Sequence, residues 1–273
     1  MNGFGALAKQ DEQNQNPEFN FNTWGVLTGF EVDFSSVYAG IALAYAESRF
    51  NADENFGSGS LNAGYGGIYV TANPSNFYIN GTLWNGCTHN KNRRSIFFSS
   101  YSEEAKSTYN VYQADGHLEF GYDFHYTRDD LSGIFEPFAS FDYAFNCEPS
   151  FNEQGSSLFK MHQNERFASM LRTELGLHHY LTLILNSGFI RFKGKLSYVN
   201  KVPFDVGNIT AHIVGEPGSF TVASLTQTQN LVSPSIEIVY KAHSGGYFTL
   251  LYDGEFGSGY FYNQFSLKAG KYF

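Results

Sequence analysis

The sequence predicts an all-β protein, a transmembrane antiparallel up-and-down β-barrel of about twelve strands. Residues 111–126 alternate between an apolar, aromatic face and a face of acids and imidazoles, as side chains on a strand do. This segment is longer than the roughly 5–6 residues of a soluble strand and fits the roughly 9–11 tilted residues that cross a bilayer. Aromatic residues make up 18% of the chain and charged residues only 16%, against about 25% charged in soluble domains.

Turn residues and polar runs set the bounds of the expected strands. Short connections alternate with long ones rich in Asn, Ser, Gln and Glu, as in barrels with tight turns at one end and long loops at the other. The expected strands are 2–9, 22–34, 37–47, 61–72, 77–87, 111–126, 134–146, 166–180, 188–200, 231–242, 246–256 and 261–273. The expected long connections run near 10–21, 48–60, 88–109, 148–165 and 201–230. The last connection, 257–259, is short, although the alternation of short and long connections puts it at the long-loop end.

Most of these segments show which face would meet lipid. In 22–34, Trp24, Val26 and Phe30 alternate with glycines, Glu31 and Asp33. Segments 134–146 and 166–180 alternate in the same way, whereas either face of 61–72 could be outward. Alternation hides such strands from hydropathy scans, because only every second residue faces lipid.

The opposite, polar faces would line the interior of the barrel. We predict a lumen-lining set of Glu31, Asp33, Asp115, His117, Glu119, Asp123, His125, Glu136, Asp142, Arg172, Glu174, Arg191, Lys193, Lys195, Glu237, Lys241, Asp253 and Glu255. Two interpretations of this set stay open. It hydrates a pore that holds a moving segment without binding it tightly, or it forms an ion-paired plug of structural residues.

No motif in the sequence predicts catalysis, a cofactor or a metal ion. His117, Asp123 and His125 lie on one face at strand spacing, but polar lumens collect such residues routinely. Gly194-Lys195 does not fit the phosphate-binding loop, because the spacing and the following residue are wrong. We therefore expect a protein that is not an enzyme and has no cofactor.

Composition excludes several classes of partner and site. The net charge of −9 argues against nucleic acid, which requires a basic surface. No run of about 18 apolar residues predicts a transmembrane helix, and no signal peptide opens the chain, so we expect its natural N-terminus upstream. Cys87 and Cys147 are too isolated for a zinc motif. Both cysteines are expected on the outward face of the barrel, with another strand between them. A disulfide and two free thiols therefore both stay open.

The order and spacing of several short motifs resemble the autotransporter β-domain of type V secretion, over essentially the whole chain. The motifs are GEPGSFTV at 215–222, LYDGEFGSGY at 251–260, RTELGL at 172–177, EFGY at 119–122, and FGA at 4–6 followed by a polar loop and WG at 24–25. The Phe- and Asn-rich composition is similar to that of the polymorphic membrane proteins of chlamydiae. One position departs from the family: Lys271 stands where its terminal strand usually carries an aromatic residue.

The resemblance implies a monomeric translocator in the bacterial outer membrane, spanning residues 1–273, with its loops facing the cell exterior. Its implied partners are outer-membrane lipid and lipopolysaccharide, the barrel-assembly machinery, periplasmic chaperones and a covalently linked N-terminal passenger. Phe265, Leu267 and Phe273 would form the C-terminal assembly signal. We expect the family's linker helix and passenger to lie outside this chain.

Other functions stay open at this point. A porin-like channel or a plain surface adhesin would have the same barrel, and steady conductance without upstream sequence would favour the channel. A barrel hydrolase would lose activity when His117 or His125 is changed. A soluble β-sandwich or lectin would be a monomer in water without detergent.

Overall fold

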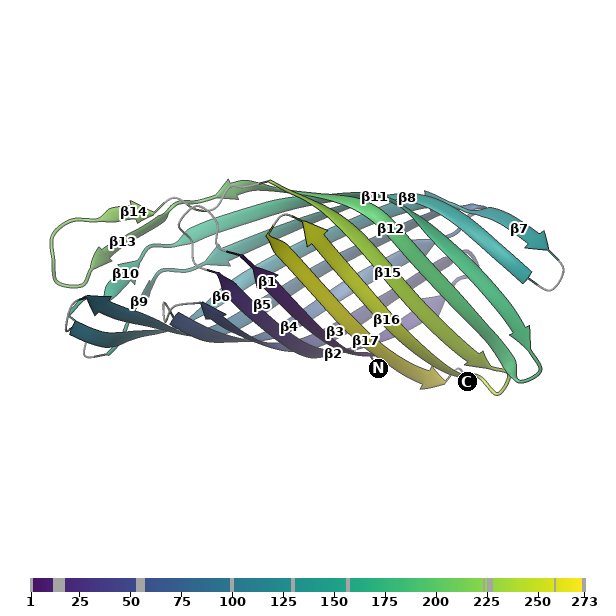
Figure 1. Cartoon of the computed structure of the whole chain (residues 1–273), viewed down its shortest axis with the longest axis horizontal. Coiled ribbons are helices and arrows are strands. Elements are labelled where there is room, and N and C mark those ends of the chain that lie inside the picture. The colour runs from purple at the N-terminus through teal and green to yellow at the C-terminus, as the bar shows by residue number, and fades with distance from the viewer. Residues whose placement is uncertain are drawn as a thin grey trace.

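The computed structural model describes residues 2–11, 18–52, 57–98, 101–128, 131–155, 158–222, 224, 228–257 and 259–271. Within these ranges, twelve strands form a closed antiparallel β-barrel, which confirms the predicted fold class (Figure 1). They are β1 (Asn2–Gln10), β2 (Phe19–Asp33), β3 (Val37–Ala52), β4 (Gly57–Ala72), β5 (Phe77–Phe98), β6 (Tyr101–Tyr122), β8 (Leu131–Glu148), β11 (Arg166–Leu185), β12 (Gly188–Val206), β15 (Gln229–Ala242), β16 (Gly246–Gly257) and β17 (Tyr260–Lys271). β17 closes the barrel by pairing with β1.

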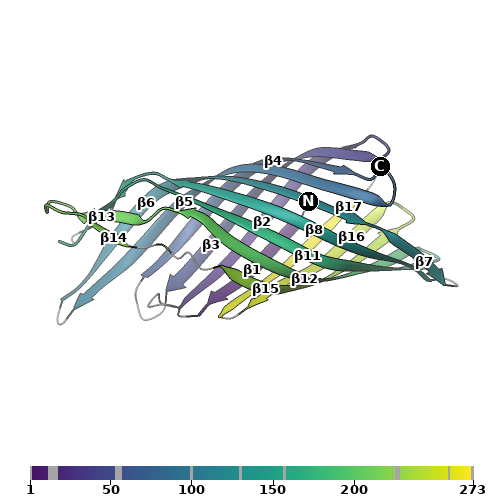
Figure 2. The same ribbon diagram turned by 90° about the horizontal axis from the view of Figure 1, so that it is seen from above.

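The two ends of the barrel differ. At the tight-turn end, short turns join β2 to β3, β4 to β5, β11 to β12 and β15 to β16, and β17 ends there with Lys271 opposite Gly246. The long-loop end is at the opposite side of the wall, and the strands run obliquely between the two (Figures 1 and 2). Among the described residues, it carries a separate four-stranded sheet in the order β14-β13-β10-β9. Its strands are β9 (Phe151–Asn152), β10 (Met161–Gln163), β13 (Ile209–Ile213) and β14 (Phe220–Val222).

The expected loop at 88–109 is wrong. β5 and β6 stay paired up to Phe98 and Tyr101, so this region is a long hairpin that stands beyond the rest of the wall. Its inner face packs under the small sheet, where Tyr109 stacks on Phe151 with ring centroids 4.0 Å apart. The polar composition resembles a loop, but cross-strand pairing and this packing hold the segment as strands. Likewise, parts of 148–165 and 201–230 form the small sheet.

The segment 111–126 is divided at Asp123, whereas the alternation predicts one strand. β6 ends at Tyr122, and β7 (Phe124–Arg128) continues along β8 in an unchanged register. The break faces Pro137 of β8, which has no N–H to contribute to the ladder. The Asp123 N–H donates instead to the Asn76 carbonyl oxygen, 2.7 Å away in the β4–β5 turn.

Apolar side chains cover the outer face of the wall. Phe30, Leu43 and Leu83 are 67%, 65% and 58% exposed, which is the pattern of a surface that meets hydrocarbon rather than water. Towards the long-loop end this band gives way to aromatic residues, including Trp24 and Tyr45, whose ring centroids lie 6.0 Å apart. Trp and Tyr are the residues enriched at the membrane–water interface. Among the described residues, no helix has the length and apolar character that crossing a membrane requires.

The two cysteines are free thiols. Cys87 on β5 and Cys147 on β8 both lie opposite Tyr112 of β6, one on each side. Two interstrand spacings amount to about 10 Å, which exceeds the roughly 7 Å limit between Cα atoms for a disulfide. Of the two interpretations left open by the sequence, the structure therefore supports the free thiols.

Consecutive residues on β5 test which face of the wall meets lipid. Leu83 points outward, whereas Thr82 lines the interior beside His117. We expect Leu83→Lys to lower the free energy of unfolding in lipid vesicles by about 2–4 kcal/mol, the cost of a cation near the bilayer midplane. Thr82→Lys, the matched control, adds the same charge to a polar interior and is expected to cost less than about 1 kcal/mol. Equal losses in denaturant titrations of the two variants would contradict the assignment of faces.

Candidate functional site

The register of the ladders groups the residues predicted to line the lumen. Residues opposite each other in an antiparallel ladder share a face, so the pairs His117–Asp142, Asp142–Arg172 and Arg172–Lys201 define one continuous row across β6, β8, β11 and β12. The predicted residues lie at alternate positions in register with this row. They are Glu31 and Asp33 on β2; Asp115, His117 and Glu119 on β6; Asp123 and His125 at β7; Glu136 and Asp142 on β8; Arg172 and Glu174 on β11; Arg191, Lys193 and Lys195 on β12; Glu237 and Lys241 on β15; and Asp253 and Glu255 on β16.

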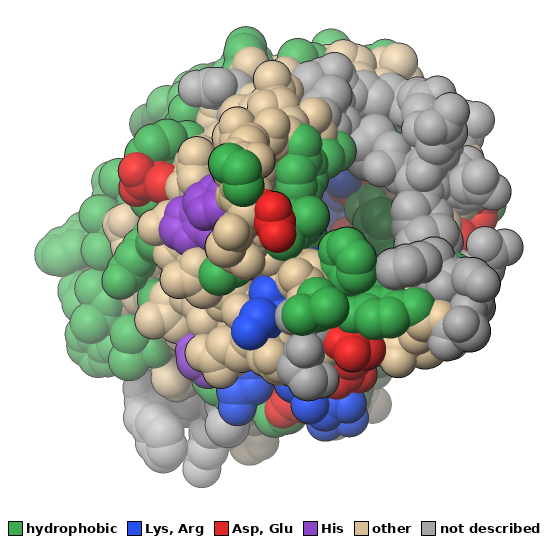
Figure 3. All heavy atoms as spheres, turned by 90° about the vertical axis from the view of Figure 1, so that its left-hand side faces the viewer, with side chains coloured by type: hydrophobic (Ala, Val, Ile, Leu, Met, Phe, Trp, Pro, Cys, Tyr) green, Lys and Arg blue, Asp and Glu red, His purple; other side chains and the backbone are tan. Residues whose placement is uncertain are grey.

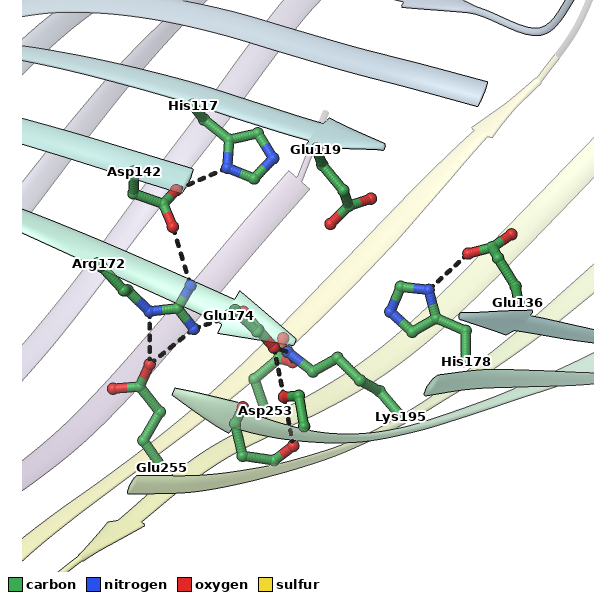
Figure 4. Close-up of polar contacts among 12 residues, drawn as sticks. His117, Glu119, Glu136, Asp142, Arg172, Glu174, His178, Lys195, Asp253 and Glu255 are labelled. Carbon is green, nitrogen blue, oxygen red and sulfur yellow. Dashed lines mark hydrogen bonds and ion pairs between the residues drawn. The ribbon is translucent and has the colours of Figure 1, made fainter. Parts of the chain in front are cut away.

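Arg172 is the centre of an ion-paired network inside the barrel (Figure 4). Its Nη1 donates to Asp142 Oδ2 at 2.9 Å, and its Nε and Nη2 donate to Glu255 Oε1 at 3.1 and 3.0 Å. Nη2 also lies 2.7 Å from Glu174 Oε2. β16 is three strands away from β11 in the wall, so the contact with Glu255 crosses the interior rather than following a ladder.

Flanking groups extend this network in both directions along the wall. Asp142 accepts a second contact from His117 Nδ1 at 2.6 Å. Lys195 Nζ lies 3.0 Å from Glu174 and 3.8 Å from Asp253. Lys201 pairs with Glu255. Glu174 and Glu255 thus each contact a second cation in addition to Arg172, namely Lys195 and Lys201. We call Arg172, Asp142, Glu174, Glu255, Lys195 and Lys201 the lumen network.

A second polar cluster lies nearer the tight-turn end. His178 is buried, stacks on Phe138 and places Nδ1 2.6 Å from Glu136. Tyr180 donates to the same carboxylate at 3.0 Å. On the neighbouring strands β5 and β6, Tyr78 donates to Glu119 at 3.1 Å. The buried Glu136 carboxylate thus has two partners, and Glu119 also accepts a hydrogen bond from Asn80 at 3.1 Å.

Several predicted residues stand apart from both clusters. Asp33 accepts the Ser35 N–H at 2.7 Å in the β2–β3 turn, and Arg191 donates to Thr182 at 3.2 Å on the adjacent strand. His125 lies 4.0 Å from Asp123 with a largely exposed side chain. The shared strand face suggested that His117, Asp123 and His125 could form one group. In the structure, His117 bonds to Asp142 instead, away from Asp123 and His125.

Sequence reasoning missed several residues that hold these clusters together. His178, Tyr180, Lys201 and Ser197 are absent from the predicted set, although all four contact its carboxylates. His178 and Tyr180 share the parity of Arg172, which was a usable signal. Lys201 was assigned to a loop because the hydrophobic pattern of this strand indicates an end at residue 200. In the structure β12 continues to Val206.

Open space remains on the other side of the interior. A cavity of about 690 Å³ follows the inner faces of β1 to β6, with Glu31, Tyr69, Trp84, His117, Tyr247 and Lys268 in its lining. Trp84 lies flat over Gly67, where a Cβ atom would stand 2.5 Å from the indole ring. Asn2, at the start of β1, also faces this space. The lumen network therefore fills one side of the barrel, and the other side stays hollow.

The small sheet covers part of the long-loop end. Arg94 of β5 donates from Nε and Nη2 to the Glu153 carboxylate at 2.8 and 2.6 Å, which ties the sheet to the hairpin. Burial, followed by the nearby Glu148 carboxylate, raises the pKa of Tyr109 beneath it. Seen from this end, charged, histidine and hydrophobic side chains intermix over the mouth (Figure 3).

Comparisons with known proteins agree with this architecture. The family model described as "Autotransporter beta-domain" matches residues 1–253. None of the curated proteins compared with the chain is a match.

Three solved structures with the same fold are transport domains of autotransporters. The chain is similar to the translocator domain of the autotransporter NalP from Neisseria meningitidis, with a TM-score of 0.73 and 14% identity over 100% of this chain and 86% of that one. It is similar to the β-domain of the Bordetella autotransporter BrkA, with a TM-score of 0.69 and 14% identity over 99% and 98%. The transport unit of AIDA-I from Escherichia coli gives 0.65 and 10% over 100% and 89%. This chain belongs to the autotransporter β-domain family, the outer-membrane translocators whose known function is passenger export.

Proposed function

We propose that this barrel exports an N-terminal passenger through the hollow side of its lumen, with the long-loop end facing the cell exterior. The position of Asn2 carries the proposal. β1 begins towards the tight-turn end, opposite Lys268 of β17 and Leu27 of β2, and Asn2 lines the cavity of about 690 Å³. A segment joined ahead of Asn2 therefore starts inside the lumen and has a path along the inner faces of β1 to β6.

The chemistry of the cavity suits an extended segment in transit. Its lining mixes amides and hydroxyls with Glu31, His117 and Lys268, which supply hydrogen bonds of either polarity. The strong cations and carboxylates of the lumen network are already paired with one another. A passing chain consequently meets a hydrated wall rather than unpaired charges that would hold it.

Assembly would use the outward face of β17. Phe265 and Leu267 are 54% and 51% exposed on that face, where lipid or a protein of the assembly machinery can contact them. Phe273, the third residue of the predicted signal, lies outside the described residues, as does the side chain of Lys271. We propose that these outward residues are read by the barrel-assembly machinery after delivery by periplasmic chaperones, and that the barrel then stands as a monomer.

We propose a conduit and anchor rather than a catalyst. His117 and His178 are each held by a carboxylate, Asp142 and Glu136 respectively. Neither pair is joined to a Ser, Cys or Thr nucleophile among the described contacts, which is what acyl-transfer chemistry would require. The energy of export must come from outside this barrel, since no nucleotide-binding motif is present in the sequence.

Site-specific crosslinking tests the route of export. With Cys87 and Cys147 replaced by Ser, a tagged segment carrying one cysteine is fused ahead of Asn2 and arrested during export. Thr82→Cys, on the cavity wall, should crosslink to this segment, whereas Leu83→Cys, on the lipid face, should not. Protease on intact cells should also remove the tag at the surface, and only when β17 is present.

A folded barrel whose tag stays in the periplasm would overturn the translocator proposal and favour a porin-like channel. Equal crosslinking at positions 82 and 83 would show a route outside the lumen. Heat-modifiable migration of the barrel in gels separates both outcomes from a failure to assemble.

Substitution of Arg172 tests whether the lumen network keeps one side of the barrel closed. Its side chain is only 18% exposed, and Arg172→Gln leaves three carboxylates short of a cation. We expect a loss of about 3–5 kcal/mol in the free energy of unfolding and a larger single-channel conductance in planar bilayers. Arg191→Gln, which removes an exposed lumen cation, should change stability by no more than about 0.5 kcal/mol. Unchanged conductance in Arg172→Gln would show that the network does not restrict the pore.

A further inference from the structure

Basic side chains gather on the outer face of the wall beyond the aromatic belt. Arg49 on β3, Lys91 and Arg93 on β5, and Lys106 on β6 line one groove of about 640 Å³ together with Asn51, Ser58, Ser60 and Thr108. The groove lies on the part of the β5–β6 hairpin that sequence reasoning assigned to a loop. Its charge contrasts with a net charge of −9 for the whole chain.

The register shows that these residues form two successive rows across four strands. The lower row is Arg49, Ser60, Lys91 and Thr108, and the upper row is Asn51, Ser58, Arg93 and Lys106. Paired residues share a face, so the four cations project from the same side of the wall. Cationic and hydroxyl side chains thus alternate within a compact area, a combination that suits phosphate oxygens.

The same ladders fix the height of the groove relative to the membrane. Tyr45 and Tyr112 lie in one row with Cys87, two rows below Arg49 and Lys91. Same-face rows on a strand are about 6.6 Å apart, which puts the basic rows about 13 and 20 Å along the strand beyond the tyrosines. With a tilt of about 40°, this is roughly 10 and 15 Å along the membrane normal, at the level of large head groups.

The cations of the groove are only partly neutralised. Arg49 pairs with Glu47 at 3.0 Å, and Lys106 pairs with Glu104 at 3.3 Å, both largely exposed and therefore weak. Lys91 and Arg93 have no acidic partner among the contacts of the described residues, and both are exposed. Two cations are therefore left to bind an anion from outside.

Among the described residues, the outward face on the opposite side of the barrel is aromatic rather than basic. At its long-loop end the outward residues of β8, β11, β12 and β17 include Phe145, Phe167, Phe204 and Phe261, and Phe145 and Phe167 lie 6.0 Å apart. That side is suited to apolar contact, whereas the β3–β6 side is suited to charged head groups. The basic groove is consequently confined to the β3–β6 side of the long-loop end.

We propose that this groove binds the phosphate groups of a phosphorylated glycolipid in the outer leaflet, with the acyl chains against the apolar band below Tyr45 and Tyr112. Both parts of such a lipid then meet a complementary surface on one set of strands: phosphates on the basic rows and hydrocarbon on residues such as Leu43 and Leu83. Lys and Arg near a charged membrane surface each strengthen binding about fivefold. The inference rests on the proposed orientation of the long-loop end but not on export.

The test measures retention of lipid by the purified full chain in detergent. Native mass spectrometry would compare bisphosphorylated lipid A with dephosphorylated lipid A, and inorganic phosphate would serve as competitor. We expect the phosphorylated lipid to bind, the dephosphorylated lipid to bind much more weakly, and Lys91→Gln/Arg93→Gln to lower affinity about 25-fold. The matched control, Lys160→Gln/Arg191→Gln, removes two cations outside the groove and should leave affinity unchanged.

Each other outcome overturns the proposal. Equal loss in the control pair would show a response to net charge alone, and equal binding of the dephosphorylated lipid would show acyl contact alone. Displacement by millimolar inorganic phosphate would indicate a site for the free anion rather than the lipid. Binding of a sulfated polysaccharide at the groove without lipid A would assign it to an acidic glycan. Ser60→Asp, which adds an acid within the lower row, supplies an independent variant that must also lose binding.

Discussion

The structure depends on one constraint: every backbone N–H and C=O in the hydrocarbon region must have a partner within the protein. An open sheet would leave the edges of β1 and β17 unpaired in lipid, at a cost of several kcal/mol for each group. Pairing from Asn2–Lys268 to Gln10–Tyr260 removes both edges. Once the wall is closed, the period of two decides which side chains face lipid and which face the confined interior.

Confinement explains why charges in the interior are paired so extensively. Arg172 contacts Asp142, Glu174 and Glu255, and these connect β8, β11 and β16 through the interior. A carboxylate left alone there would lose its hydration without compensation. Grouping these charges on β8, β11, β12 and β16 satisfies them and keeps the lumen network away from the cavity along β1 to β6. The lumen is hollow on one side because the ion-paired charges are concentrated on the other. Asn2, near the start of the chain, lies on the hollow side.

Local periodicity in the sequence predicted the barrel, most strand positions and the inward parity of residues such as Glu174. It could not predict that Arg172 meets Glu255, because that contact depends on the curvature and closure of the whole wall. It also failed for 88–109, where most residues are polar and the few apolar ones, such as Ile96 and Ala105, form no regular alternation. Pairing there is maintained by long-range contacts such as Arg94 with Glu153, which no window of sequence contains. Similarly, Asp123 breaks the ladder because of Pro137 on another strand.

The two halves of the wall therefore have different physical characters. The half from β8 to β16 is braced internally by ion pairs and is apolar and aromatic outside. The half from β1 to β6 lines the cavity, receives the start of the chain, and carries the basic rows on its outer face. This half does not carry the lumen network, so its wall gains from another source of rigidity while a segment moves along it. A lipid whose phosphates connect β3, β5 and β6 from outside would supply such a brace where the interior must stay open.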